Sequence, residues 1–205
     1  DQRLTEQRKI DQWDVDIKIQ SKQLRSGKDF LGDGTVELSG RQDSFDQNFS
    51  LNIPGGYVKG RAGFSRDGEG LKGYARLDID QFDYGILLHR LNPENKTNGL
   101  LSAKVDITLS GQNYSRRFDH ANGTLDFAIW PKNIEAEVMD FWAVNLFFAI
   151  LPPLSEDTSK VNCLVSLLDI DDGIMKEEFF AVDSSKVWLN GNLDVNFRDE
   201  SIDLA

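Results

Sequence analysis

Apolar and polar residues alternate along much of the chain, and this pattern limits the fold more than any other feature of the sequence. A period of two places apolar side chains on one face of a β-strand and polar side chains on the other. The pattern therefore predicts antiparallel sheet with one apolar and one polar face. The alternating runs are residues 15–19, 49–53, 77–79, 101–109, 125–129 and 193–197.

Turn motifs separate these runs. A glycine or an Asn-Gly pair precedes several similar segments, such as GLKGYARLDI and LNGNLDVNF, which indicates one β-hairpin unit used repeatedly. We therefore predict a curved antiparallel sheet or β-groove within one β-rich domain over residues 1–205. The predicted turns are Gly32-Asp33-Gly34, Pro54-Gly55-Gly56, Asp67-Gly68, Asn98-Gly99, Asn122-Gly123, Asp172-Gly173 and Asn190-Gly191.

Two segments depart from the alternating pattern and predict helices. Residues 84–91 form a possible short helix that ends before Asn92-Pro93. Residues 135–151 are apolar nearly all round and stop at Pro152-Pro153, so this helix is predicted to be buried or to lie against lipid. Its apolar part is too short to span a bilayer.

Composition excludes several classes of function. The net charge of −11 argues against nucleic acid as a partner and against attachment to anionic lipid headgroups by charge alone. It leaves open the binding of lipid through apolar surface. A single cysteine, Cys163, and two histidines, His89 and His120, leave no Cys/His zinc set and few candidates for a catalytic triad. We predict no cofactor.

The acidic cluster near residue 170 resembles a calcium loop at first sight. Counted from Asp169, the fifth position of an EF-hand loop is Gly173 and the twelfth is Phe180, so two defining ligands are missing. Asp172-Gly173 instead predicts a type I′ hairpin turn between apolar strands at 161–170 and 179–182. A metal site at Asp169, Asp171 and Asp172 stays the less supported alternative, and no metal ligand is predicted.

Other chemical candidates also have a simple structural explanation. Carboxylate pairs for glycoside chemistry are more readily explained as a solvated strand face. Tryptophans that could stack on sugars are more often core or edge residues, and His120 is a weak catalytic candidate in a loop. We therefore predict a protein that is not an enzyme and has no catalytic residue. The residues considered are Asp78, Asp80, Asp83, Glu135, Glu137, Trp13, Trp130, Trp142 and Trp188.

The apolar face of such a sheet must be covered by another sheet, by a helix or by a ligand. A β-sandwich is the simplest solution on periodicity alone. A long curved sheet with its apolar face inward would instead leave a trough for acyl chains, because each buried methylene contributes about 0.8 kcal/mol. The predicted lipid contacts are Leu101, Val105, Ile107, Leu125, Phe127, Ile129, Phe141, Trp142, Phe148, Leu193, Val195 and Phe197.

A further set of motifs lies in residues 75–205. They are Asn162-Cys163 before an apolar strand, Asp172-Gly173-Ile174, Phe180 to Ser185, Leu189 to Val195 and Glu200 to Leu204, with Phe82 to Leu87 and Gly99 to Leu101 upstream. Through these motifs, residues 75–205 resemble the C-terminal region of the AsmA family of bacterial envelope proteins. Ser184 stands where the family usually has threonine, and Asn192 where it usually has glycine.

The resemblance implies a non-enzymatic periplasmic protein that is held in the inner membrane by an N-terminal anchor and supports outer-membrane assembly and integrity. It implies phospholipid binding or transfer through a hydrophobic groove, with outer-membrane assembly proteins as possible partners. The chain would then be a fragment of a longer protein, and both of its ends look cut. Two alternatives stay open: a β-sandwich carbohydrate-binding or adhesion module, and a scaffold for outer-membrane protein assembly.

Overall fold

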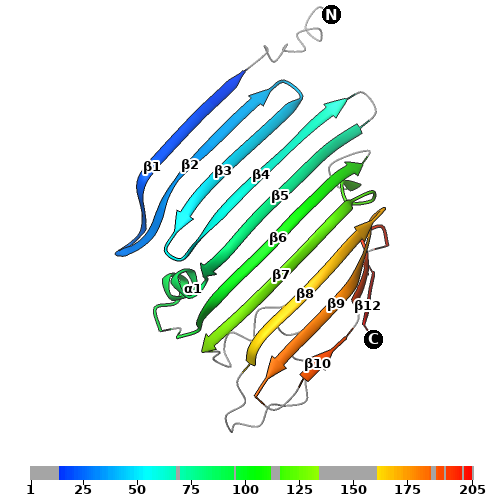
Figure 1. Ribbon diagram of the computed structural model, residues 1–205. Helices are drawn as coiled ribbons and strands as arrows, with labels where there is room; N and C mark the ends of the chain where they lie inside the picture. The colour runs from blue at the N-terminus through cyan, green and yellow to red at the C-terminus, as the bar shows by residue number, and fades with distance from the viewer. Residues whose placement is uncertain are drawn as a thin grey trace, which may run out of the picture.

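The computed structural model describes residues 14–67, 70–94, 96–111, 116–133, 161–185, 188–191, 193–199 and 201–204. These residues form one twelve-stranded antiparallel sheet and one short helix (Figure 1). From β1 to β9 the strands follow one another across the sheet in chain order, and β11 and β12 continue it beyond β9. β10 pairs with a different part of β9. The predicted antiparallel sheet is confirmed.

Most strands are long. The bounds are β1 (Val15–Ser26), β2 (Asp29–Arg41), β3 (Ser44–Ile53), β4 (Gly56–Asp67), β5 (Gly70–Asp83), β6 (Asn98–Gly111), β7 (Asn122–Asn133), β8 (Val161–Asp171), β9 (Ile174–Ser184), β10 (Trp188–Asn190), β11 (Leu193–Asn196) and β12 (Ser201–Leu204), with helix α1 (Gly85–Leu91) between β5 and β6.

The register of the strands sorts the side chains by polarity. Val105 on β6 lies opposite Leu77 on β5 and Leu125 on β7. Its neighbour Lys104 lies opposite Asp78 and Asp126 on the other face. A slip of one residue would exchange the two faces, so the alternation in the sequence holds this register in place.

The sheet is open and curls at both sides. At the β1–β2 turn, a Cβ on Gly27 would lie 2.8 Å from a guanidinium nitrogen of Arg90 in α1, so this turn reaches the helix that follows β5. At the opposite side, Arg198 after β11 donates a hydrogen bond of 2.9 Å to the carbonyl oxygen of Asp119 before β7. The described strands make one curled sheet, whereas a sandwich needs two packed sheets.

Two local predictions are confirmed. Asp172 and Gly173 both have positive φ, +46° and +79°, in the turn between β8 and β9, as a type I′ hairpin requires. The short helix near 84–91 is α1, and the Gly85 N–H at its start donates to Asp83 Oδ1 at 2.9 Å. The helix predicted at 135–151 lies outside the described residues. Within the described part of the chain, no helix has the length and apolar character needed to cross a membrane.

Three predicted turns are wrong. Gly32-Asp33-Gly34 lies inside β2, and Asn98-Gly99 and Asn122-Gly123 begin β6 and β7. Gly32 is required because the backbone of β3 lies close to it, and not because the chain turns there. It has φ +135°, and a Cβ there would overlap with the carbonyl oxygen of Asn52 on β3.

Candidate functional site

One face of the sheet is apolar across most of its strands. We call it the apolar face and define it by cross-strand rows, which are residues that lie opposite one another on successive strands. The central row is Val36, Phe49, Gly60, Leu77, Val105, Leu125 and Leu168, on β2 to β8. The rows on either side are Leu51, Val58, Ile79, Ala103, Phe127, Ser166 and Phe180, and Gln47, Ala62, Ala75, Ile107, Gly123, Ile170, Met175 and Val195.

The structure brings the predicted lipid contacts of β6 and β7 together. Leu101 lies opposite Ile129, and Val105 lies opposite Leu125. Ile107 lies opposite Gly123, and Phe127 lies opposite Ala103. The side chains of the six predicted residues on these two strands are half-buried and share the apolar face. Their contact with lipid stays a prediction.

The other predicted contacts are more scattered. Val195 on β11 lies at the far end of a row that passes through Met175, and Leu193 lies on the same strand. Phe197 does not continue that strand, which ends at Asn196; its ring packs against Phe118 with 5.7 Å between centroids. Phe141, Trp142 and Phe148 lie outside the described residues.

Exposure varies across the apolar face. On the β1 side, Ile17 is 42% exposed and Ile19 is 56% exposed. On the β8–β9 side, Leu168 is 6% exposed and Val182 is 2% exposed. Among the described residues, no second sheet covers the face. The exposed apolar side chains at the β1 end make that part of the face a candidate binding surface.

Besides Gln47 in one of the flanking rows, a polar pair on β8 and β9 interrupts the apolar face. Ser166, opposite Phe127, is buried, and its hydroxyl donates a hydrogen bond of 3.0 Å to Glu177 Oε1 on β9. A bulge in the register of β8 and β9 places the carboxylate of Glu177 on this face. Glu177 lies opposite Leu168, so this pair stands at the β9 end of the central row.

The sequence reasoning missed the share of the apolar face that β2 and β4 contribute. Glycines replace large residues there and hide the alternation, as at Gly60 in the central row. A Cβ at residue 60 would overlap with the ring of Phe49 on β3, so the glycine makes room for that ring. The signal in the sequence was Phe49 itself, inside an alternating run that implied neighbours on both sides.

Three loops meet at one corner of the sheet, which we call the loop corner: the segment 116–121 before β7, the β8–β9 turn and the turn after β11. His120 Nδ1 donates a hydrogen bond of 2.6 Å to Asp172 Oδ1. Arg198 forms an ion pair with the other carboxylate oxygen and donates to the carbonyl oxygen of Asp172 at 2.6 Å. These contacts, that of His120 foremost, hold the pKa of Asp172 below its ordinary value of 3.8. They give His120 and Asp172 a role in joining the loops.

Stability is expected to depend on pH through Asp172. Because its pKa is lower in the folded chain, the ionised carboxylate stabilises the fold above pH 3.8, and this contribution is lost as the pH falls through the folded-state pKa. Asp172→Asn should therefore lower the urea midpoint at about pH 7, and its difference from the wild-type chain should shrink as the pH falls below 3.8. Asp171→Asn, an exposed neighbour, serves as control. If the difference in urea midpoint between the variant and the wild-type chain were unchanged at low pH, the charge of Asp172 would have no part in stability.

The polar face also carries exposed apolar side chains near the β7–β10 side. Trp130 and Trp188, two of the four tryptophans considered for a sugar platform, lie there on β7 and β10. Leu167 and Phe179 lie opposite each other on β8 and β9. These four side chains are 38% to 62% exposed. Trp13 and Trp142 lie outside the described residues, so the platform stays a prediction.

Of the carboxylates considered for glycoside chemistry, Asp78 accepts a hydrogen bond of 3.3 Å from the Tyr57 hydroxyl on the polar face. Asp80 lies on the same strand, opposite Tyr57. Glu135 and Glu137 lie outside the described residues. The contacts of Asp78 are those of a solvated strand face.

Comparison with known proteins supports the resemblance found in the sequence. The chain is similar to the AsmA family protein YhjG of Escherichia coli (strain K12), with 21% identity over 201 residues. The alignment covers 95% of this chain and 29% of YhjG, so the chain spans less than a third of the relative it matches. No family profile and no solved structure matches the chain. The predicted resemblance to the AsmA family is confirmed, and it extends over nearly the whole chain.

Proposed function

We propose that this AsmA-like region is a lipid-binding part of a longer cell-envelope protein, and that acyl chains lie along the apolar face of its sheet. The observation that carries the proposal is the central row of the apolar face, which has no polar side chain from β2 to β8. Its strands supply apolar side chains in register, and the described residues include no second layer over them. The similarity to an AsmA family protein supports the same function.

The dimensions of the face suit an acyl chain. Along β6, the apolar positions from Leu101 to Leu109 extend over about 26 Å at the usual rise per strand residue. One leaflet of a bilayer has a hydrocarbon thickness of about 15 Å, so an extended acyl chain fits along one strand. Each covered methylene contributes about 0.8 kcal/mol, so about ten of them contribute about 8 kcal/mol before the cost of ordering the lipid.

The finer parts of the proposal concern the whole protein. Phospholipid transfer between inner and outer membrane, a periplasmic location, an N-terminal anchor in the inner membrane and contact with outer-membrane assembly proteins are supported by the family similarity. The proposal needs no catalytic residue and no cofactor, since the apolar face binds by surface burial alone.

Native mass spectrometry of the purified chain tests the proposal. The chain is first stripped of lipid, then incubated with mixed bacterial phospholipids and separated from free vesicles. We expect complexes whose added mass equals one or more phospholipids, and lipid extraction of the same sample should identify them. A chain that keeps its β-sheet circular dichroism and never carries lipid would contradict the proposal.

A further inference from the structure

The polar face has a depression where β2 and β4 end and β3 and β5 begin. Its volume is about 840 Å³, and it runs from β2 to β7. Among the described residues, its charged lining consists of four cations, Arg41, Arg61, Lys72 and Arg76, and one carboxylate, Asp46. The whole chain has a net charge of −11, so this local excess of cations is opposite in sign to the rest of the protein.

The strand register arranges the outer part of the depression as one cross-strand row of hydrogen-bond donors. Arg41, Ser44, Ser65, Lys72 and Ser110 lie opposite one another on β2 to β6. The row holds two cations and three hydroxyl groups. Such a set of donors fits an anion with several acceptor oxygens.

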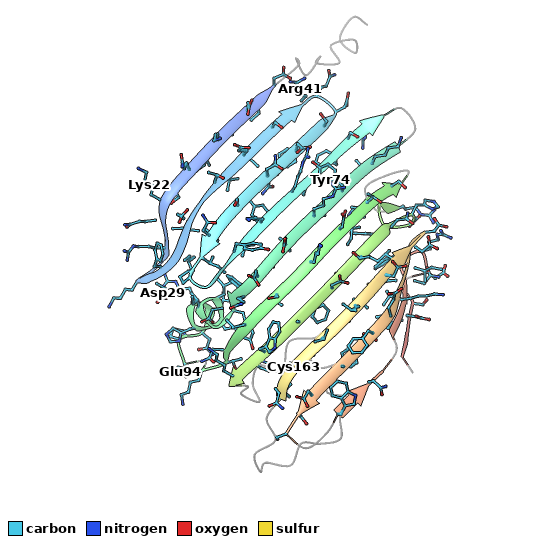
Figure 2. All side chains as sticks on the ribbon, viewed as in Figure 1. Lys22, Asp29, Arg41, Tyr74, Glu94 and Cys163 are labelled. Carbon is cyan, nitrogen blue, oxygen red and sulfur yellow. The ribbon has the colours of Figure 1, made fainter. Side chains whose placement is uncertain are left out.

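The next row gives the depression a fixed floor. The Tyr74 ring lies over Gly63, since a Cβ at residue 63 would lie 2.8 Å from a ring carbon (Tyr74 is labelled in Figure 2). The Tyr74 hydroxyl donates a hydrogen bond of 2.6 Å to Asp46 Oδ2. The guanidinium carbons of Arg61 and Arg76 lie 5.3 and 5.9 Å from the ring centroid. Arg61 and Arg76 also pair with Asp46 and Asp106, so these two arginines are positioned by protein partners.

We propose that this depression binds a phosphate-type oxyanion, with Arg41 and Lys72 as its charged ligands and the serine hydroxyls between them as hydrogen-bond donors. The Cα atoms of Arg41 and Lys72 are three strand spacings apart, about 14 Å, and both side chains are long enough to converge above Ser44 and Ser65. The depression is larger than one phosphate, so the group would be carried by a larger polar molecule. A soluble phosphorylated compound and a lipid headgroup share this chemistry.

Binding of inorganic phosphate tests the site directly, because inorganic phosphate is the smallest such oxyanion. The chain is titrated at constant ionic strength, and binding is followed by backbone amide shifts in NMR spectra. We expect saturable shifts at Ser44 and Ser65. We expect the double variant Arg41→Gln/Lys72→Gln to bind at least about tenfold more weakly, because charge-assisted hydrogen bonds are lost.

A matched control separates a site from a general charge effect. The double variant Lys59→Gln/Lys104→Gln loses the same charge from the same face, at exposed positions outside the depression. It should weaken phosphate binding less than about twofold. Equal weakening in both double variants, or no saturable shift in the wild-type chain, would overturn the proposal.

Vesicles identify the source of the oxyanion. The wild-type chain and both double variants are sedimented with vesicles of phosphatidylcholine, with and without phosphatidylglycerol. Loss of phosphatidylglycerol-dependent binding only in Arg41→Gln/Lys72→Gln would assign the site to a lipid headgroup. Phosphate binding that depends on Arg41 and Lys72, without a difference on vesicles, would assign it to a soluble phosphorylated compound. The proposal is independent of lipid loading, since the depression lies on the face opposite the acyl chains.

Discussion

Leu125→Glu is expected to abolish lipid loading of the chain, whereas Ser50→Glu should leave it intact. Leu125 lies on the apolar face between Val105 and Leu168, at the centre of the sheet. Ser50 lies on the polar face opposite Lys59, so a new carboxylate there has a cation as its neighbour. A carboxylate held against an acyl chain must lose its hydration or take up a proton, which costs several kcal/mol. We therefore expect lipid affinity to fall about 100-fold or more.

Lipid loading of both variants is measured by native mass spectrometry, with urea unfolding as the check on folding. Leu125 is packed beside a buried residue, so Leu125→Glu could unfold the chain. A second variant therefore tests the same face at another position. Leu51→Glu is suitable, because Leu51 is half-buried on β3, next to Ser50 in the sequence and opposite Gly34. Normal loading in a folded Leu51→Glu or Leu125→Glu chain would refute the apolar face as the lipid site.

The sequence predicted those strands whose apolar positions carry large side chains without interruption. β6 is the clearest case, because every second residue from Leu101 to Leu109 is apolar. The sequence did not predict β2 and β4, because Gly34, Gly60 and Gly63 occupy positions where the alternation of apolar and polar residues needs a side chain. These glycines are explained only by residues of neighbouring strands, such as the Phe49 ring over Gly60, so the explanation requires the register.

The candidate site shows the same division between local and long-range information. The sequence placed Leu101, Val105 and Ile107 on one face of a strand, because alternation is a local property. It did not pair His120 with Asp172, which are 52 residues apart, because their hydrogen bond depends on three loops that meet at one corner. The depression around Tyr74 was missed for a similar reason, since its cations come from different strands and look like ordinary polar positions in each of them.

Gly123→Ala is expected to destabilise the chain far more than Gly55→Ala. Gly123, at the start of β7, has φ +141°, where alanine is strained. A Cβ there would also overlap with the carbonyl oxygen of Asp106 on β6 and lie 2.9 Å from the Cα of Ile107. Both contacts are with backbone, so relief requires the two strands to separate. Strain and overpacking together should lower the free energy of unfolding by about 4 kcal/mol.

Gly55 is the matched control, because it also has positive φ, +89°, and no atom lies within 4 Å of a Cβ built there. Gly55→Ala therefore reports backbone strain alone, about 1–2 kcal/mol. The two variants are compared by urea unfolding followed by circular dichroism. Since the clash at residue 123 exists only if Gly123 lies opposite Ile107, equal losses would show that the register between β6 and β7 is wrong. The apolar face depends on that register, because a shift by one residue would turn Leu125 and Phe127 away from Val105 and Ala103.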